Sequence, residues 1–208
     1  MNIHWYPNHM AYGLKKMKRL KDLDLLLEVR DSRIPISSQN PILEGIASAK
    51  PRLIIYNKCD LSDPMLNQRL IQPNALLMSN VNRLKPDVSP IMKKIRSMLK
   101  HEEKERYKIM VVGIPNVGKS TILNRLRAFG SEIGGGRAVK VGNLPGVTRL
   151  VSSLVRISDK PRIYVYDTPG VLLPKSPSPE ATMKLAATGA CPSTHRADYD
   201  GAEYLIDI

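Results

Sequence analysis

Short apolar runs alternate with amphipathic segments along the first half of the chain. Four of the runs are continuous, which is typical of strands buried inside a parallel sheet. They cover residues 24–29, 52–56, 76–78 and 109–112. Apolar residues recur at helical spacing over 9–21, 41–49 and 88–106. This alternation predicts an α/β protein of three layers, in which helices cover both faces of a mostly parallel sheet.

The second half of the chain follows a different pattern. Residues 150–157 and 162–166 flank the turn at 158–161, which predicts a β-hairpin and thus one antiparallel strand. Residues 130–149 are rich in glycine and predict a long loop of the kind that often carries function. A proline-rich linker follows, and residues 178–190 then predict a helix with a serine N-cap.

The sequence GIPNVGKST at residues 113–121 matches the phosphate-binding pattern G-x-x-x-x-G-K-[ST] between a predicted strand and helix. Backbone N–H groups in such a loop point at phosphate oxygens, and the helix N-terminus adds positive charge. We expect Lys119 to bind the β- and γ-phosphates and the Ser120 hydroxyl to bind Mg²⁺. The other nucleotide contacts of this phosphate loop are expected from Asn116, Val117, Gly118 and Thr121.

A second motif, at the end of the strand 52–56, specifies the base. Asn57, Lys58 and Asp60 fit N-K-x-D, and on its own this pattern could be an ordinary polar loop. Beside a phosphate loop it indicates GTP, because a carboxylate can accept hydrogen bonds from both the ring N–H and the exocyclic amine of guanine. Asn57 can bind the other edge of the base and tie the two loops together, and the Lys58 stem can cover the ring.

A third motif, D-x-x-G, follows the second hairpin strand. Asp167 can hold Mg²⁺ through water, and the Gly170 N–H can meet the γ-phosphate, so that the segment relaxes on hydrolysis. Thr148, in the predicted loop, is the candidate for a second hydroxyl on Mg²⁺. These assignments predict a P-loop fold that binds and hydrolyses GTP.

The order of the motifs is unusual, because the guanine motif at 57–60 precedes the phosphate loop at 113–121. A GTP-binding domain can still form if the chain is circularly permuted, since termini that lie close together can be joined and the chain opened elsewhere. We therefore predict a circularly permuted GTP-binding domain over residues 1–175 and a linker with the start of a helical region over 176–208.

Composition bears on the partners of the protein. Lys and Arg number 32 against 19 acidic residues, a net charge of +13, which favours nucleic acid or an anionic membrane surface. Aromatic residues are only 5% of the chain, so phosphate contacts fit better than base stacking. The two cysteines make no disulfide framework or metal-ligand set. We expect neither a signal peptide nor a transit peptide from residues at the start of this sequence, and no apolar run reaches the about 18 residues that a membrane span needs.

With these motifs in this order, the sequence resembles the circularly permuted GTPases of ribosome assembly, and in particular their mitochondrial members. Further matching stretches are HWYPNHM at 4–10, DSRIP at 31–35, PGVT at 145–148 and DTPGVLLP at 167–174. Tyr6 and Asn8 depart from the usual Phe-Pro-Gly-His-Met entry motif. The resemblance implies Ser79 and Asn80 as a second guanine loop.

The resemblance also implies partners and a location. These are the large ribosomal subunit and its RNA, and the mitochondrial matrix, with peripheral association with the inner membrane left open. The family continues into a helical C-terminal domain linked to RNA binding, so we expect this 208-residue chain to be a fragment or a shortened isoform. Besides a GTP-hydrolysing assembly factor, a GTP-gated binding module without its own turnover and an inactive truncated product remain alternatives.

The catalytic step lacks its usual side chain. Many GTPases carry a Gln after D-x-x-G that orients the attacking water, and here that position is Val171. The resemblance implies His9 as a substitute, although His9 could equally anchor the first helix. In similar potassium-stimulated GTPases an Asn at the place of Asn116 helps to hold K⁺ near the phosphates, while the alternative is an amide that shapes the loop. We expect slow hydrolysis that K⁺ and the ribosome stimulate.

Overall fold

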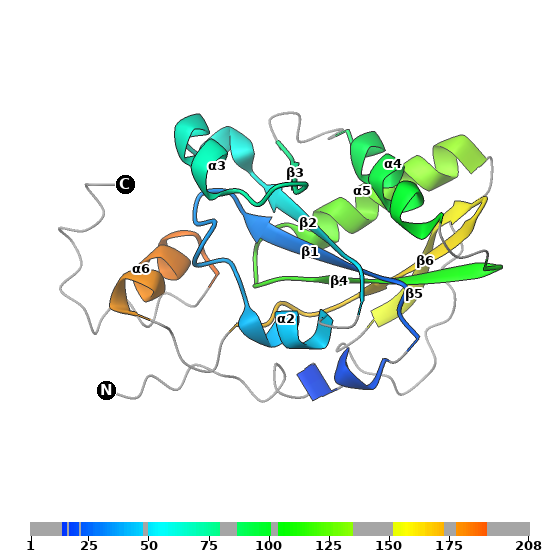
Figure 1. Ribbon diagram of the computed structural model, residues 1–208, viewed down its shortest axis with the longest axis horizontal. Coiled ribbons are helices and arrows are strands. Elements are labelled where there is room, and N and C mark those ends of the chain that lie inside the picture. Colours follow the sequence, from blue (N-terminus) through cyan, green and yellow to red (C-terminus); the bar gives the residue numbers. More distant parts are fainter. Residues whose placement is uncertain are drawn as a thin grey trace.

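The structure is a computed structural model with one six-stranded sheet between helices (Figure 1). It describes residues 14–15, 17–20, 22–47, 50–79, 87–100, 104–134, 152–172 and 178–190. The strands are β1 (Leu25–Asp31), β2 (Arg52–Asn57), β3 (Leu76–Leu77), β4 (Arg106–Val112), β5 (Ser152–Asp159) and β6 (Arg162–Asp167). The helices are α2 (Pro41–Ala47), the 3₁₀ turn η1 (Cys59–Leu61), α3 (Pro64–Leu70), α4 (Ser89–Leu99), α5 (Lys119–Gly134) and α6 (Pro179–Ala187).

The sheet has the strand order β3-β2-β1-β4-β6-β5. All neighbouring strands are parallel except β5 and β6, which pair antiparallel as the predicted hairpin. The strand that leads into the phosphate loop, β4, pairs with β1 from the beginning of the described chain. The predicted three-layer, mostly parallel α/β fold with a circularly permuted GTP-binding domain is confirmed.

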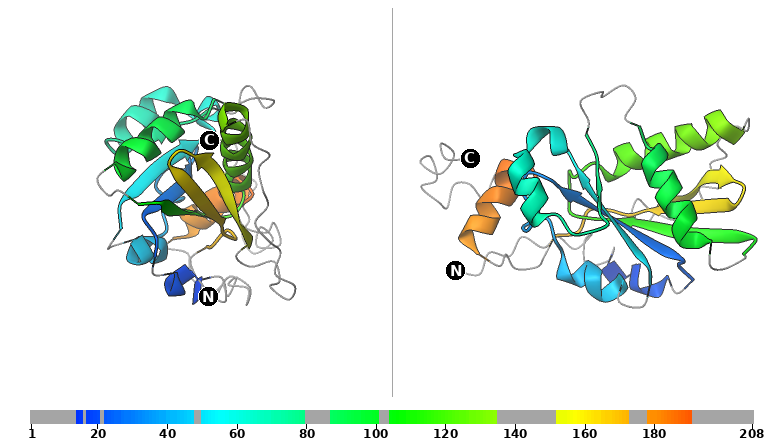
Figure 2. Two further views of the ribbon diagram at one scale, coloured as in Figure 1. Left: turned by 90° about the vertical axis from the view of Figure 1, so that its right-hand side faces the viewer. Right: turned by 45° about the horizontal axis from the view of Figure 1, so that its top comes forward.

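Two hydrophobic cores form because β1 is covered on both faces, and all seven of its residues are buried. Leu25, Leu27 and Val29 belong to the core beneath α4 and α5. The alternate residue Leu26 belongs to a smaller core with Leu43 of α2. Figures 1 and 2 show the same division, with α3, α4 and α5 on one face of the sheet and α2 on the other. Within the described residues, no helix is long and apolar enough to cross a membrane.

The end of β1 differs from the sequence-based expectation. The sequence predicted a strand over residues 24–29, but the strand runs on through Arg30 to Asp31. Arg30 Nε donates to Glu28 Oε1 at 2.6 Å, and its Nη1 donates to the hydroxyl of Tyr56 at 3.3 Å. An arginine can stay in a buried strand because these partners satisfy its charge and its hydrogen bonds.

Two other predicted boundaries were wrong. Helix α4 ends at Leu99 instead of continuing to residue 106, and β4 begins at Arg106, where it pairs with Arg162 of β6. The loop expected from residue 130 begins later, because α5 continues to Gly134. A Cβ at Gly130 would lie 2.0 Å from the carbonyl oxygen of Ile157, so this glycine lets the helix approach β5 rather than ending it. Residues 135–149 of that loop lie outside the described part.

Candidate nucleotide-binding site

The predicted motifs all follow the carboxyl ends of parallel strands and therefore gather at one edge of the sheet. The phosphate loop follows β4, the D-x-x-G segment begins at the end of β6, and the N-K-x-D loop begins at the end of β2. Helix α6 lies at this same end of the molecule (Figure 1). This is the edge at which open α/β sheets bind their ligands.

The backbone of the phosphate loop needs its glycines. Gly113 has a φ of 150°, and a Cβ there would lie 2.3 Å from the carbonyl oxygen of Val29 on β1. Gly118 has a φ of 96°, and Asn116 between them is left-handed with a φ of 58°. The loop therefore turns tightly against β1 and presents the N-terminus of the 16-residue helix α5.

Lys119 is the first residue of α5, and its side chain is only 7% exposed. Its Nζ donates to the carbonyl oxygen of Ile114 in the same loop at 2.7 Å. Burial lowers the pKa of Lys119 to about 8, although the nearby Asp167 carboxylate acts in the opposite direction. A phosphate group beside this buried ammonium would stabilise its charged form. The next residue, Ser120, is exposed.

The guanine motif is joined to the phosphate loop by hydrogen bonds. Asn57, which is fully buried, donates from Nδ2 to the carbonyl oxygen of Val117 at 2.7 Å. A Cβ at Gly118 would lie 2.3 Å from the same Nδ2, so the two loops touch. Lys58 Nζ donates to the carbonyl oxygen of Asn116 at 2.8 Å. The expected tie between the two loops is present, whereas the contacts of Asn57 and Lys58 to a base remain predictions.

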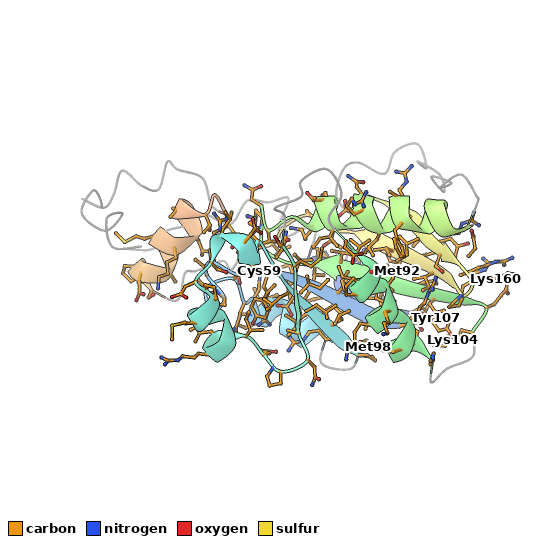
Figure 3. All side chains as sticks on the ribbon, turned by 90° about the horizontal axis from the view of Figure 1, so that it is seen from above. Cys59, Met92, Met98, Lys104, Tyr107 and Lys160 are labelled. Carbon is orange, nitrogen blue, oxygen red and sulfur yellow. The ribbon has the colours of Figure 1, made fainter. Side chains whose placement is uncertain are left out.

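The rest of the guanine loop faces outward. Asp60 is exposed in η1, which suits a carboxylate that accepts hydrogen bonds from a base. Cys59 N donates to the carbonyl oxygen of Met78 at 3.0 Å, which places Ser79 next to this loop. Seen from above, Cys59 lies far from Lys104 and Lys160, which mark the opposite end of the molecule (Figure 3).

The D-x-x-G segment lies directly on the phosphate loop. Thr168 Oγ1 donates to the carbonyl oxygen of Val111 at 2.5 Å. A Cβ at Gly170 would approach the Cα of Pro115 to 2.6 Å, so only glycine fits there. Gly170 therefore lies against the phosphate loop, and we expect its N–H to contact the γ-phosphate bound there.

The oxygen donors at this edge fit a Mg²⁺ site. Oδ1 of Asp167 is buried and has no hydrogen-bond partner within the described chain. Burial raises the pKa of Asp167, and the charge of Lys119 offsets part of that rise. The orphaned carboxylate oxygen of Asp167 and the exposed Ser120 are of the hard oxygen type that Mg²⁺ prefers. A bound cation would relieve the cost of burying this carboxylate.

Val171, at the position of the usual catalytic Gln, is part of the hydrophobic interior. Its side chain is fully buried in the smaller core, which also contains Met17 and Leu43. The backbone is fixed on both sides, because Val171 N donates to the carbonyl oxygen of Gly113 at 3.2 Å and Asn40 Nδ2 donates to the Val171 carbonyl oxygen at 2.8 Å. Val171 is therefore a packing residue here and does not orient water.

Sequence reasoning assigned no role to several polar residues that the structure places in or beside the site. Asp31 and Arg33 pair with each other next to Lys58, and Asn40 anchors the backbone at Val171. The signal for Asp31 and Arg33 in the sequence was the DSRIP stretch at 31–35, which was noted only as part of the resemblance. Three predicted site residues lie outside the described part of the chain, and they are His9, Asn80 and Thr148.

A phosphate loop, a D-x-x-G segment and an N-K-x-D loop on one sheet, joined in permuted order, define the class of circularly permuted P-loop GTPases. A family profile described as "50S ribosome-binding GTPase" matches residues 108–200. A solved structure, the GDP-bound structure of TM YlqF, has a TM-score of 0.55 and 21% identity over 87% of this chain and 67% of that one. At that identity the likeness supports the fold alone.

Curated relatives identify the family. Mitochondrial ribosome-associated GTPase 1 of Mus musculus is 39% identical over 97% of this chain and 65% of its own length. The Xenopus tropicalis protein of that name is 38% identical, with 99% of this chain and 69% of the relative covered. Mitochondrial GTPase 1 of Schizosaccharomyces japonicus is 34% identical, with 97% and 70% covered. The chain belongs to this family of mitochondrial ribosome-associated GTPases, and it spans about two thirds of the length of these relatives.

Proposed function

We propose that this chain binds GTP, hydrolyses it to GDP and phosphate, and acts as a nucleotide-dependent switch in the assembly of the mitochondrial large ribosomal subunit. The hydrogen bond from Asn57 Nδ2 to the Val117 carbonyl oxygen carries the proposal, because it joins a guanine motif to a phosphate loop in one site. The names of the relatives support the ribosomal partner and the mitochondrial location.

Binding would use both loops. Asp60 accepts hydrogen bonds from the guanine ring, while the phosphate-loop amides and Lys119 bind the phosphates. Second contacts to the base come from Ser79 and Asn80. Lys119 exchanges its hydrogen bond to Ile114 for one to phosphate oxygen, which keeps the buried ammonium paired.

Mg²⁺ would be held by Ser120 and Thr148 directly and by Asp167 through water, and GTPases of this family generally use it. When bound, it neutralises charge on the β- and γ-phosphate oxygens. Gly170 packs against Pro115 of the phosphate loop, and its N–H would make the γ-phosphate contact that hydrolysis removes.

The attacking water needs a group other than Val171, whose side chain is fully buried. His9 is one candidate for that role. K⁺ held in part by Asn116 is the other, and it would supply charge stabilisation near the β- and γ-phosphates. Asn116 is exposed at the tip of the phosphate loop, and its amide nitrogen donates to the carbonyl oxygen of Gly189. Its amide oxygen is therefore the end that can face a cation.

Potassium dependence tests the role of Asn116. We expect turnover to be several-fold faster in K⁺ than in Na⁺, and Asn116→Gly to abolish that difference. Glycine is the suitable replacement because it adopts the φ of 58° without strain, so that only the amide is lost. Phosphate release measured in matched chloride salts gives the answer. Equal rates of the wild-type chain in both salts would exclude a catalytic K⁺ at Asn116.

Lys119 should make nucleotide binding dependent on pH. With a pKa of about 8 in the free protein, Lys119 loses its proton as the pH rises through that value, whereas a bound nucleotide keeps it charged. We expect GDP affinity to fall about tenfold between about pH 7 and about pH 9, with proton uptake on binding. Calorimetry in two buffers of different ionisation enthalpy measures the uptake. No uptake and constant affinity would contradict the lowered pKa.

The basic charge of the chain suits ribosomal RNA, because a net charge of +13 favours contacts to phosphates. A location in the mitochondrial matrix, with peripheral attachment to the inner membrane as an option, follows from this partner. Fractionation of mitochondria, followed by a salt wash of the membranes, would separate matrix protein from protein bound to the membrane by charge.

Phosphate release from the purified chain, with and without mitochondrial large subunits, tests the proposal. We expect slow release alone and a clear increase with large subunits, and no such increase with small subunits. GTP binding without release under either condition would instead indicate a GTP-gated binding module. A chain that neither binds GTP nor melts cooperatively would be an inactive product.

A further inference from the structure

We propose that Asp31 and Arg33 are positioning residues that couple the two nucleotide loops to the C-terminal turn of α6. The inference rests on the proposed nucleotide site. It adds a set of contacts through which a nucleotide bound in the phosphate loop affects α6. Neither residue belongs to the phosphate, guanine or Mg²⁺ contacts described above.

The carboxylate of Asp31 lies at the centre of a polar cluster with Arg33 and Lys58. It is 2% exposed at the end of β1. Arg33 donates to it from Nε at 3.0 Å, from Nη2 at 2.8 Å and from the backbone N at 3.0 Å. Lys58 Nζ donates to it at 2.9 Å. Burial alone would raise the pKa of Asp31, but these hydrogen bonds outweigh burial and hold that pKa below its ordinary value.

Lys58 connects this cluster to the phosphate loop. Its ammonium is shared between the Asp31 carboxylate and the carbonyl oxygen of Asn116, at 2.9 and 2.8 Å. Both Lys58 and Asn116 have left-handed backbones, with φ values of 62° and 58°. The left-handed conformation is unfavourable for a non-glycine residue unless surrounding contacts stabilise it. Here the Lys58 ammonium links the two left-handed residues through its hydrogen bond to Asn116. Asp31 therefore fixes the relative positions of the guanine and phosphate loops.

Arg33 and Asn116 connect this cluster to α6 by hydrogen bonds. Arg33 Nη2 donates to the carbonyl oxygen of Thr188 at 3.4 Å, and Asn116 Nδ2 donates to that of Gly189 at 2.5 Å. These two carbonyls belong to the turn that ends α6, in which Gly189 has a φ of 74°. Hydrogen bonds from Gly189 N to Ala186 O and from Ala190 N to Leu185 O close the turn.

The chemistry of this turn suits a contact that can form and break. The last carbonyls of a helix carry partial negative charge, and the Arg33 guanidinium beside them is favourable. The Arg33 side chain is 27% exposed, so this contact can exchange with water. A ligand that shifts Asn116 or Lys58 changes the contacts that hold the turn. The end of α6 thereby responds to the nucleotide although it lies outside the phosphate and guanine motifs.

Two variants separate the roles of the pair. Asp31→Asn keeps the shape of the side chain but removes the charge that orders Lys58 and Arg33. We expect this variant to release a fluorescently labelled GDP about tenfold faster. Arg33→Ala leaves Lys58 on Asp31 and should mainly free the turn. For it we expect amide exchange over residues 185–190 to be about tenfold faster, measured by mass spectrometry on the full chain. We also expect GDP to slow this exchange in the wild type but not in Arg33→Ala.

Lys104→Ala is the matched control, because it removes another ion pair, to Asp24 at 2.7 Å, at the opposite end of the molecule (Figure 3). It should change neither GDP release nor exchange over 185–190. The proposal is overturned if Arg33→Ala leaves that exchange unchanged with and without GDP, or if folded Asp31→Asn releases GDP at the wild-type rate. If Asp31→Asn does not fold, Arg33→Ala decides. Failure of the wild type to bind GDP would refute the proposed function. Amide exchange over residues 185–190 in Arg33→Ala without nucleotide would still test the contact to α6.

Discussion

Lys119→Met is expected to lower the affinity for GTP at least about a hundredfold, equivalent to about 2.7 kcal/mol, and to abolish hydrolysis. Methionine is similar in length and apolar, so the variant removes the charge while filling the same space. Lys119 is 7% exposed, in a loop whose other phosphate contacts are expected to be backbone amides. A charged hydrogen bond in so buried a place contributes more to binding than it would in water. Titration with a labelled GDP, and phosphate release, measure the two effects.

The stability of this variant distinguishes a binding defect from misfolding. Lys119 has a pKa lowered by burial, so its charge costs folding free energy at neutral pH. We therefore expect Lys119→Met to melt at or above the wild-type temperature. Lys184→Met serves as the control, because this lysine on α6 pairs with Glu180 at 2.5 Å and is 39% exposed. Affinity within about threefold of the wild type in Lys119→Met would contradict the assignment of the phosphate loop.

Asp60→Asn is expected to change the base that the site accepts. The Asp60 carboxylate accepts from two guanine donors, whereas an amide presents one acceptor and one donor. Xanthine has a carbonyl oxygen in place of the exocyclic amine of guanine, so it matches the amide. We expect GTP affinity to fall about a hundredfold or more and xanthosine triphosphate to bind better than GTP. Competition of both nucleotides against labelled GDP measures the change.

Asp63→Asn controls for a general effect of removing a carboxylate near this loop. Asp63 accepts a hydrogen bond from Met65 N at 2.8 Å at the start of α3, and an asparagine can make the same bond. This variant should keep the preference for GTP. If Asp60→Asn also kept it, the base would be read elsewhere, and the N-K-x-D loop would have no role in specificity.

The fold was predictable because its strongest signals are local. The run Leu25–Leu27 of β1 and the run Ile109–Val112 of β4 are buried on both faces, so these runs are apolar and stand out in the sequence. Motif order then predicted the permutation, since the strand before the phosphate loop must pair with those before it in the chain. Local signals also misled where contacts were distant. Gly130 reads as a helix breaker, but it allows α5 to pack on Ile157.

The site was predictable only as far as its motifs extend. Phosphate and guanine loops have fixed spacings because each binds one ligand within a few residues. Asp31 and Arg33 lack such a spacing, and the contact from Arg33 to Thr188 spans 155 positions. The burial of Val171 likewise depends on Met17 and Leu43, which lie more than a hundred residues earlier in the chain. Roles that arise from tertiary contacts cannot be assigned from a local pattern, so the DSRIP stretch indicated the family without giving Asp31 and Arg33 a function.

The central claim is that residues 57–60 and 113–121, which occur in permuted order, form one site for a guanine nucleotide. Displacement of labelled GDP from the purified chain by GTP and by ATP, in the presence of Mg²⁺, tests this claim most directly. We predict that GTP displaces the label at concentrations at least about a hundredfold lower than ATP, because only guanine offers two donors to Asp60. Equal displacement by GTP and ATP would show that the two motifs do not act on one nucleotide.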